Sequence, residues 1–310
     1  MSLRVTFLGT GGAVPTTRRN TSSIFLRREG DRLLFDCGEG TQRQMMRFGT
    51  GFAVSHIFLT HIHGDHTLGI PGLLQTMDFN EREAALSIHV PTAARNRLEA
   101  FIDAASGRPS FPLRINGVGD EDTVLDGDGY EITAFRTDHD TPSVGYALKE
   151  DERKGRFDRE RAEELGVPVG PMYQKLHAGE SVELDDGTVV ESEQIVGPPR
   201  PGRTVVYTGD TRPVDRTAEV ARDADLLIHD ATFAADNETR ARRTGHSTAE
   251  SAADIANRAG AKRLALVHIS SRYAGNADPI ERDAEGAFSG EDAFVPEDGD
   301  VAEIPYPDAA

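Results

Sequence analysis

The chain has 310 residues, of which 52 are acidic and 34 are lysine or arginine, so its formal net charge at pH 7 is −18. No apolar run approaches the ~20 residues that a membrane-spanning helix needs, and the single cysteine, Cys37, excludes an internal disulfide bond. These features exclude a helical membrane protein and a disulfide-stabilised secreted domain, and they predict an unexported protein of the reducing cytoplasm.

Only four of the basic residues are lysines, and this acidic, lysine-poor composition is typical of the cytoplasm of a salt-loving organism. At 0.1 M salt such a net charge would repel nucleic acid over a Debye length of ~10 Å. At molar salt that length falls to ~3 Å, so only local charge matters. The net charge therefore does not rule out a nucleic-acid partner.

Strands are predicted wherever β-branched or aromatic residues form a short run between glycine, proline or acidic turns. In chain order these runs are Leu3–Leu8, Ser23–Arg27, Leu33–Phe35, His56–Thr60, Leu86–Val90, Tyr130–Arg136, Gly145–Leu148, Thr204–Tyr207, Leu226–His229 and Leu264–Val267. Helices are predicted over Ile70–Phe79, Thr92–Ala105 and Ser247–Ala259, the last with Ser247-Thr248 as its candidate N-terminal cap. Strands interleaved with helices indicate an α/β layered fold.

The segment from Glu150 to about Arg200 is dense in charge and poor in residues of the kind that form a core. Its charge pattern predicts a short polar helix over Asp158–Leu165, followed by an extended, turn-rich stretch from Gly166 to Pro171. The length of the chain fits one domain with an insertion as well as two domains. We predict a single domain over residues 1–310, with an arm inserted at 150–200 that projects from it.

The C-terminal residues 278–310 hold eleven acidic residues against the single basic residue Arg282. Such a run of like charge favours a solvated and partly disordered acidic tail.

The predicted strand His56–Thr60 runs directly into a cluster of side chains that can bind metal. The cluster reads His61-Ile62-His63-Gly64-Asp65-His66. Because a strand places residues i and i+2 on one side, His61 and His63 can point at a common ion, and Gly64 lets the backbone turn so that Asp65 and His66 reach a second point nearby. Imidazole and carboxylate ligands suit zinc, which binds nitrogen and oxygen at ~2.0–2.2 Å. The alternative, a surface histidine cluster without metal, does not explain the regular spacing directly after an apolar strand.

Further candidate ligands also follow predicted strands. Asp138-His139 comes after Tyr130–Arg136, Asp210 lies within T-G-D-T after Thr204–Tyr207, and His268 comes after Leu264–Val267. Side chains at the ends of successive strands converge on one edge of a sheet, where α/β folds place their sites. Any one of these residues alone would indicate a capped turn or a core histidine, but together with the first cluster they indicate a metal site.

Taken together, H-x-H-x-D-H, a later lone histidine, the aspartate of G-D-T and a final strand-end histidine resemble the metallo-β-lactamase fold. The resemblance implies an αββα sandwich, in which two sheets pack face to face and helices cover both outer sides. It also implies two zinc ions per subunit. By this resemblance His61, His63 and His139 would hold the first zinc, Asp65, His66 and His268 the second, and Asp210 would bridge both.

Enzymes of this fold hydrolyse lactams, thioesters, sulfate esters and phosphodiesters, so the fold does not fix the substrate. Four further segments are similar to the ribonuclease Z family, and the resemblance covers most of the chain up to Tyr273. They are F-L-G-T-G-G-A-V-P-T-T-R-R-N-T-S-S, L-L-F-D-C-G-E-G-T-Q-R-Q, G-V-P-V-G-P and H-I-S-S-R-Y. The resemblance implies a homodimeric endonuclease that cuts precursor tRNA after the discriminator nucleotide, leaving a 3′-hydroxyl on the tRNA and a 5′-phosphate on the trailer.

Two loops extend the resemblance, with one departure. The family carries His-Glu-Ala-Thr where this chain has His229-Asp230-Ala231-Thr232, and His-Ser-Thr where it has His246-Ser247-Thr248. By the resemblance, Asp230 would orient His246, which would protonate the leaving 3′ oxygen. Asp65 would orient the attacking water and take its proton.

A similar arm in bacterial and archaeal relatives clamps the tRNA elbow, far from the 3′ end that is cut. The residues expected to contact RNA in this chain are Lys154, Arg156, Gly170, Pro171, Arg18 and Arg272. The alternative for the arm is a solvated helix, because acidic residues lie among its basic ones.

Two other functions stay open. A small-molecule phosphodiesterase or arylsulfatase-like hydrolase would share the zinc motifs, but a small substrate does not need an inserted arm. A non-catalytic RNA-binding subunit would carry a degraded H-x-H-x-D-H motif, and in this chain the motif is intact.

Overall fold

The computed structural model describes residues 2–307. The chain divides into two compact units. The larger unit holds the residues up to 149 together with 204–305, and the smaller unit holds residues 150–203 together with 306–307.

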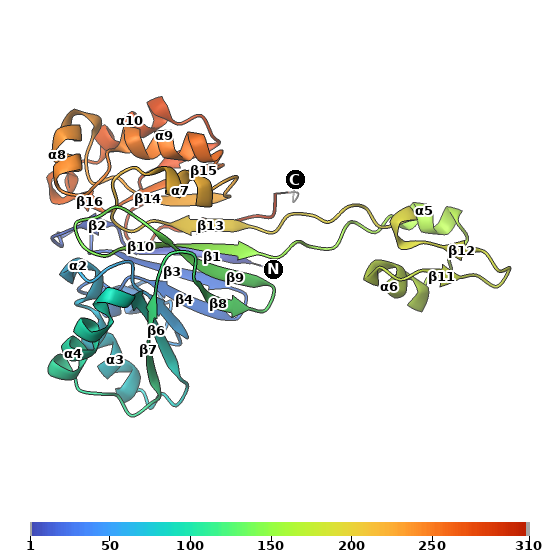
Figure 1. The fold of residues 1–310 in the computed structure, drawn as a ribbon, viewed down its shortest axis with the longest axis horizontal. Coiled ribbons are helices and arrows are strands. Elements are labelled where there is room, and N and C mark those ends of the chain that lie inside the picture. Colours follow the sequence, from blue (N-terminus) through green and yellow to red (C-terminus); the bar gives the residue numbers. More distant parts are fainter. Residues whose placement is uncertain (1, 308–310) are drawn as a thin grey trace. The chain divides into compact units, whose positions relative to one another are not determined.

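Within the described residues, the larger unit is built on two sheets of seven strands each (Figure 1). The first sheet has the order β18 (Val301–Glu303), β1 (Leu3–Gly9), β3 (Ser23–Arg28), β4 (Asp31–Phe35), β5 (His56–Phe58), β6 (Leu86–Pro91) and β7 (Leu113–Val118). The second sheet has the order β17 (Asp292–Phe294), β15 (Arg263–Val267), β14 (Leu226–Asp230), β13 (Thr204–Tyr207), β10 (Val144–Glu150), β9 (Tyr130–Arg136) and β8 (Thr123–Gly127). A short parallel pair, β2 (Gly11–Gly12) with β16 (Ile269–Ser270), joins two loops beside them.

The strands alternate their side chains between two apolar layers, as the period of two requires. In β13, Val205 and Tyr207 enter the core between the two sheets, and Val206 enters the core on the outer side of the second sheet. In β3, Ile24 and Leu26 face the same central core, and Phe25 faces the outer side of the first sheet. The runs are apolar on both faces because both faces of each sheet are buried.

Helices cover both outer faces of the sandwich. Figure 1 shows α3 and α4 on the outer side of the first sheet, and α7, α9 and α10 on the outer side of the second. The helices of the larger unit are α1 (Thr41–Arg47), α2 (Gly64–Thr67), α3 (Ile70–Phe79), α4 (Arg95–Ala105), α7 (Asp215–Val220), α8 (Glu238–Arg243), α9 (Ala249–Ala259) and α10 (Asp278–Ala287). The predicted αββα sandwich is therefore confirmed. Within the described part of the chain, no helix combines the length and apolarity needed to cross a membrane.

The predicted elements of the larger unit recur in the structure with small changes at their ends. The predicted helix Ile70–Phe79 matches α3. Helix α9 begins at Ala249 rather than at Ser247, because Thr248 is its N-cap and accepts a hydrogen bond from Ser251 N. Its buried face is almost all alanine, which lets the helix lie close against the sheet. The strands that were not predicted include β7 and β8, which lie at sheet edges and are largely half-buried or exposed.

The expectation of a solvated acidic tail is wrong for residues 278–307. Ile280 and Ala284 of α10 are fully buried in the outer core of the second sheet, and β18 pairs with β1. One acidic side chain, Asp298, is drawn inward because it accepts hydrogen bonds from Thr10 N, Asn20 N and Gln44 Nε2. Apolar residues at helical spacing and these donors outweigh the like charge of the segment.

The smaller unit has more internal structure than its composition predicted. Its helices are α5 (Arg159–Glu164) and α6 (Pro171–Ala178), and its strands β11 (Val182–Glu183) and β12 (Val189–Val190) form a hairpin. Asp158 caps α5 by accepting a hydrogen bond from Arg161 N. The segment is not poor in core residues as expected, since it has a small apolar core of its own, made by Ala162, Val167, Leu176, Val182, Val190 and Ile195.

Candidate metal centre and active site

The candidate ligands come from the carboxyl ends of strands in both sheets. His61 and His63 follow β5, His139 follows β9, Asp210 follows β13, and His268 follows β15. Asp65 and His66 lie in α2, whose N-cap is His63, so a single helical turn brings them beside the first two histidines. This turn, rather than a special conformation of Gly64, redirects the chain, since Gly64 has no positive φ.

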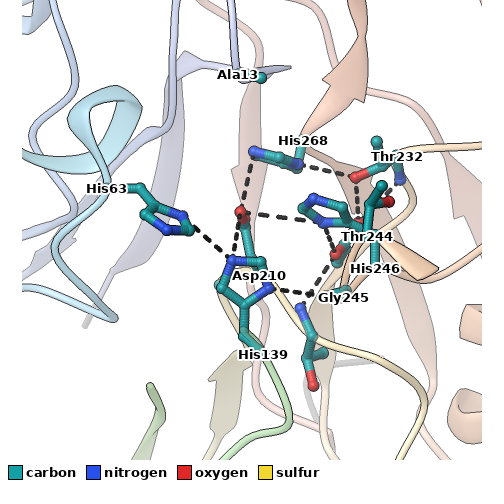
Figure 2. Close-up of polar contacts among 12 residues, drawn as sticks. Ala13, His63, His139, Asp210, Thr232, Thr244, Gly245, His246 and His268 are labelled. Atoms are coloured by element: carbon teal, nitrogen blue, oxygen red, sulfur yellow. Dashed lines mark hydrogen bonds and ion pairs between the residues drawn. The ribbon is translucent and has the colours of Figure 1, made fainter. Parts of the chain in front are cut away.

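These side chains form two groups that share one carboxylate. In each group the candidate ligand atoms lie within 4.8 Å of one another. The first group is His61, His63, His139 and Asp210, and the second is Asp65, His66, Asp210 and His268. Asp210 Oδ1 lies 3.2 Å from His66 Nε2, and Asp210 Oδ2 lies 3.2 Å from His268 Nε2 and 3.7 Å from His61 Nε2. Figure 2 shows His63, His139, His246 and His268 gathered around Asp210.

The polar atoms at this centre fit divalent metal ions better than they fit each other. His66 Nε2 and Asp210 Oδ1 are buried and have no hydrogen-bond partner among the described residues. Ring nitrogens also face ring nitrogens, with His63 Nδ1 3.0 Å from His61 Nε2 and 3.2 Å from His139 Nε2. Burial, together with neighbouring imidazoles, lowers the pKa of His61 and His63, which keeps their lone pairs free for metal. The site is therefore suited to divalent metal.

Four of the five candidate ligand imidazoles are held through the other ring nitrogen. His61 Nδ1 lies 3.0 Å from Thr60 Oγ1, His66 Nδ1 lies 2.8 Å from Asp36 Oδ2, His139 Nδ1 lies 2.8 Å from the Gly245 carbonyl oxygen, and His268 Nδ1 lies 2.8 Å from Thr232 Oγ1. Such partners fix the tautomer and the orientation of a ligand histidine. None of these four partners was predicted from the sequence motifs.

Asp36 is the most connected of these partners. It is fully buried, and its carboxylate also accepts hydrogen bonds from Thr60 N and Tyr207 OH, both at 2.8 Å. It directly follows β4, so its position after a strand at the same sheet edge was a signal that could have identified it.

His246 lies next to the ligand groups and is paired with Asp230. His246 Nδ1 is 2.8 Å from Asp230 Oδ2, so the shorter aspartate of this chain does reach the histidine. The other carboxylate oxygen of Asp230 accepts hydrogen bonds from Thr232 N and Thr232 Oγ1, and Thr211 N donates to Oδ2. Burial lowers the pKa of His246, but Asp230 raises it more, with help from Asp210, and the net result is a pKa of about 9.

Asp210, Asp230, His246 and His268 are also close enough to form a third group of possible ligands. The His246–Asp230 hydrogen bond occupies the facing atoms of that pair, however, and this arrangement is that of an oriented acid or base.

The residues expected to contact RNA are all at the surface except Gly170, which is half-buried. In the larger unit, Arg18 and Arg272 are exposed, and Arg18 donates a hydrogen bond to the Gly275 carbonyl. Arg18 also lines a cleft of about 690 Å³ with Arg47 and Tyr273. In the smaller unit, Lys154 and Arg156 are exposed, and Gly170 and Pro171 form the start of α6.

Comparison with known proteins finds two family profiles that match parts of the chain and ribonuclease Z proteins that match its full length. Residues 3–150 match the family profile of the anti-Pycsar protein Apyc1, and residues 194–269 match that of the beta-lactamase superfamily domain. The chain is 74% identical to a Ribonuclease Z of Natronomonas pharaonis, over 99% of this chain and 100% of the relative, and 60% identical to a Ribonuclease Z of Haloferax volcanii, over 100% and 97%. Its structure is similar to that of human tRNase Z, short form, with a TM-score of 0.69 at 28% identity, covering 97% of this chain and 99% of the human chain. With these identities over its whole length, the chain belongs to the ribonuclease Z family.

Proposed function

We propose that this chain is the endoribonuclease that removes the 3′ trailer from precursor tRNA. It cuts after the discriminator nucleotide and leaves a 3′-hydroxyl on the tRNA and a 5′-phosphate on the trailer. The observation that carries the proposal is that a complete metal-ligand set and the His246–Asp230 pair occur together in a chain 74% identical to a Ribonuclease Z.

We propose zinc as the metal, with two ions per subunit. His61, His63 and His139 would hold the first ion, Asp65, His66 and His268 the second, and Asp210 would contribute to both. When bound, such a pair supplies Lewis-acid chemistry, making water nucleophilic near neutral pH and neutralising charge on the attacked phosphate. The nitrogen and carboxylate donors suit this ion.

The protein's own groups then move the protons. Asp65 Oδ2 is held by the Ala13 amide at 2.8 Å, which fixes the carboxylate that orients the attacking water and takes its proton. His246 is held through Nδ1 by Asp230, so its Nε2 is the atom left to donate a proton to the leaving 3′ oxygen. Two separate groups for the two proton transfers allow the base and the acid to act on opposite sides of the phosphate.

The smaller unit is the part that we assign to the tRNA elbow. Its exposed Lys154 and Arg156 supply positive charges for phosphate contacts, and Gly170 with Pro171 presents a rigid start to α6. Its separate core means that it can hold this shape without residues of the catalytic unit.

We also propose that the enzyme works as a homodimer in the reducing cytoplasm. Met46 of α1, Leu68 after α2 and Phe79 of α3 are large apolar side chains that are 67%, 51% and 87% exposed, and a second subunit would cover them. Replacing Phe79 and Met46 with serine should shift the sedimentation coefficient at molar salt from that of a dimer to that of a monomer. The buried, unpaired Cys37 suits a reducing compartment.

The test is to incubate the zinc-loaded protein with an end-labelled precursor tRNA at molar salt and to map the cut. One product ending at the discriminator nucleotide with a 3′-hydroxyl is expected, and the Asp65→Ala variant should give none. Hydrolysis of a small phosphodiester with no cut in the precursor would contradict the proposal and favour the small-molecule phosphodiesterase.

A further inference from the structure

Arg212, which lies two residues after Asp210, links three loops of the larger unit. Its guanidinium donates to Asp138 Oδ1 at 3.1 Å, to Asp140 Oδ1 at 2.8 Å and, through Nε, to the Arg242 carbonyl at 2.8 Å. The side chain is 26% exposed. Neither the sequence motifs nor the proposed mechanism gives this residue a role.

On one side, these contacts hold the loop that carries His139. Asp138 and Asp140 flank the histidine, and both are bound to the same guanidinium. The backbone strengthens the link, because Arg212 N donates to the Asp138 carbonyl at 2.8 Å, and Asp138 N donates to Thr211 Oγ1 at 3.1 Å. His139 is therefore fixed on both sides to the segment that carries Asp210.

On the other side, the contact with Arg242 holds the segment that leads to His246. Arg242 lies in the last turn of α8, and the chain then passes through Thr244 and Gly245 to His246. His246 N donates to the Ala241 carbonyl at 2.9 Å, so the position of the histidine follows that of the helix end. Gly245, whose carbonyl faces His139 Nδ1, has φ 77°, and a Cβ there would lie 2.7 Å from that nitrogen (Figure 2).

We propose that Arg212 is a positioning residue that sets where His246 lies relative to His139 and Asp210. It acts through His246, so this inference rests on the proposed function of that histidine as the general acid. A planar guanidinium can reach its three acceptors in fixed directions at once, which the single ammonium group of a lysine cannot do. Because these are direct hydrogen bonds, molar salt, with its Debye length of ~3 Å, weakens them less than it weakens attraction between more distant charges.

The test is a double-mutant cycle. Arg212→Gln and Arg212→Lys are made in the wild type and in His246→Ala, and kcat and KM for precursor tRNA are measured at molar salt with zinc in excess. Arg216→Gln is the matched control, since Arg216 pairs with Asp120, Glu121 and Glu219 at 33% side-chain exposure, and its ion pairs among residues 2–307 involve neither loop. Metal content is measured for every variant.

In the wild-type background, Arg212→Gln should lower kcat at least tenfold with KM within twofold, Arg212→Lys should restore only part of the rate, and Arg216→Gln should change it less than twofold. In the His246→Ala background, Arg212→Gln should cost less than twofold. Equal losses in both backgrounds, or a loss that follows metal content, would overturn the proposal. If Arg212→Gln does not fold, the same cycle with Arg212→Lys decides.

A second readout needs no activity. In the metal-free protein, hydrogen exchange of the amides in residues 138–143 and 244–248 should be at least tenfold faster in Arg212→Gln than in the wild type or in Arg216→Gln. Unchanged exchange in both segments would overturn the inference. If His246→Ala alone cuts as fast as the wild type, the acid role in the proposed function fails, and the exchange measurement still tests whether Arg212 holds the two loops.

Discussion

His246 and His63 contribute to the site in different ways, and substitution of each should separate these contributions. His63 offers its Nδ1 to the ligand group, at 3.0 Å from His61 Nε2. His246 Nδ1 instead pairs with Asp230, and the His246 side chain is 13% exposed at the edge of the candidate metal centre. Substitution of His63 is therefore expected to slow hydrolysis of every substrate. Substitution of His246 is expected to slow only that of substrates with a poor leaving group.

We predict that His246→Ala slows cleavage of precursor tRNA by ~10²–10⁴-fold, the usual range for general acid–base catalysis. Metal content should not change, because the seven ligand side chains are intact. Hydrolysis of an activated diester, bis(p-nitrophenyl) phosphate, should fall far less, since its leaving group needs no proton. Equal losses on the two substrates would mean that His246 is structural.

We predict that His63→Ala abolishes hydrolysis of both precursor tRNA and the activated diester, because the first ligand group loses one of its four members. His177→Ala is the matched control, since His177 is an exposed histidine of the smaller unit. The measurement is turnover of both substrates after metal has been restored. More than a few per cent of the wild-type diester rate in His63→Ala would argue against the two-metal assignment.

Helices and strands that are set by the sequence of their own residues could be predicted from short apolar patterns. The central strands and α3 have apolar runs of sufficient length, and most candidate ligands follow a strand closely, so both could be proposed from sequence spacing. Edge strands such as β7 have mixed polarity, because one edge and much of each face stay in contact with solvent. A period-two apolar pattern is therefore weak there.

The partners of the ligands were not predictable in the same way. Asp36 meets His66 from 30 residues earlier in the chain, and the Gly245 carbonyl meets His139 from 106 residues later. A backbone carbonyl leaves no mark in residue type. Asp36 follows β4 as the candidate ligands follow their strands, but its contacts with His66, Thr60 and Tyr207 depend on the fold. Such contacts depend on how the two sheets pack.

The pairing of β5 with β6 brings together half-buried His56 and buried His89, neither of which belongs to the candidate ligand set. His56 Nδ1 and His89 Nε2 are 3.0 Å apart, and the His89 ring stacks on Phe58 with centroids 4.8 Å apart. Burial, aided by His56, lowers the pKa of His89 to about 4, and burial also lowers the pKa of His56. Both rings are thus held neutral in the folded state.

This pair should make the free energy of unfolding pH-dependent. The unfolded chain binds a proton at each histidine near pH 6.5, but folded His89 does so only near pH 4. Stability is therefore full above pH 6.5 and falls as the pH drops from 6.5 to 4, by up to about 1.4 kcal/mol per pH unit for one such group. His89→Gln should flatten this dependence relative to the wild type, and the exposed His177→Gln should not.

The measurement is urea denaturation of the metal-free protein at molar salt between pH 7.5 and 4.5, so that proton binding by metal ligands is the same background in all three proteins. A wild-type slope that survives unchanged in His89→Gln would assign the acid sensitivity to other groups.

The whole molecule carries a net charge of −18, and its RNA substrate is also strongly negative. The identity to haloarchaeal proteins agrees with the salt-loving origin predicted from the composition. In molar salt, binding then depends on direct contacts, and these require basic residues to be presented individually rather than as a basic field. The exposed Lys154 and Arg156 of the smaller unit meet this requirement locally.

The smaller unit can be removed at a point where its two connecting passages adjoin. Gly197 N donates to the Arg156 carbonyl, and a Cβ on Gly155 would lie 1.8 Å from the Gly197 carbonyl oxygen. A short glycine–serine linker in place of residues 156–196 therefore needs no long span. It also keeps the buried Glu150–Arg203 pair, in which Arg203 Nε and Nη2 each lie 2.7 Å from a Glu150 oxygen.

We predict that this replacement raises KM for precursor tRNA at least tenfold, which is about 1.4 kcal/mol or more of binding, because the phosphate contacts remote from the cut are lost. Hydrolysis of bis(p-nitrophenyl) phosphate should stay within about twofold, since all ligand residues lie in the larger unit. The double substitution of Lys154 and Arg156 by alanine is the milder control and should raise KM without touching the hairpin β11–β12. A parallel loss of activity on both substrates would show instead that the segment supports the catalytic unit or the dimer contact. A clamp for the tRNA elbow should not alter turnover of a diester that is too small to reach it.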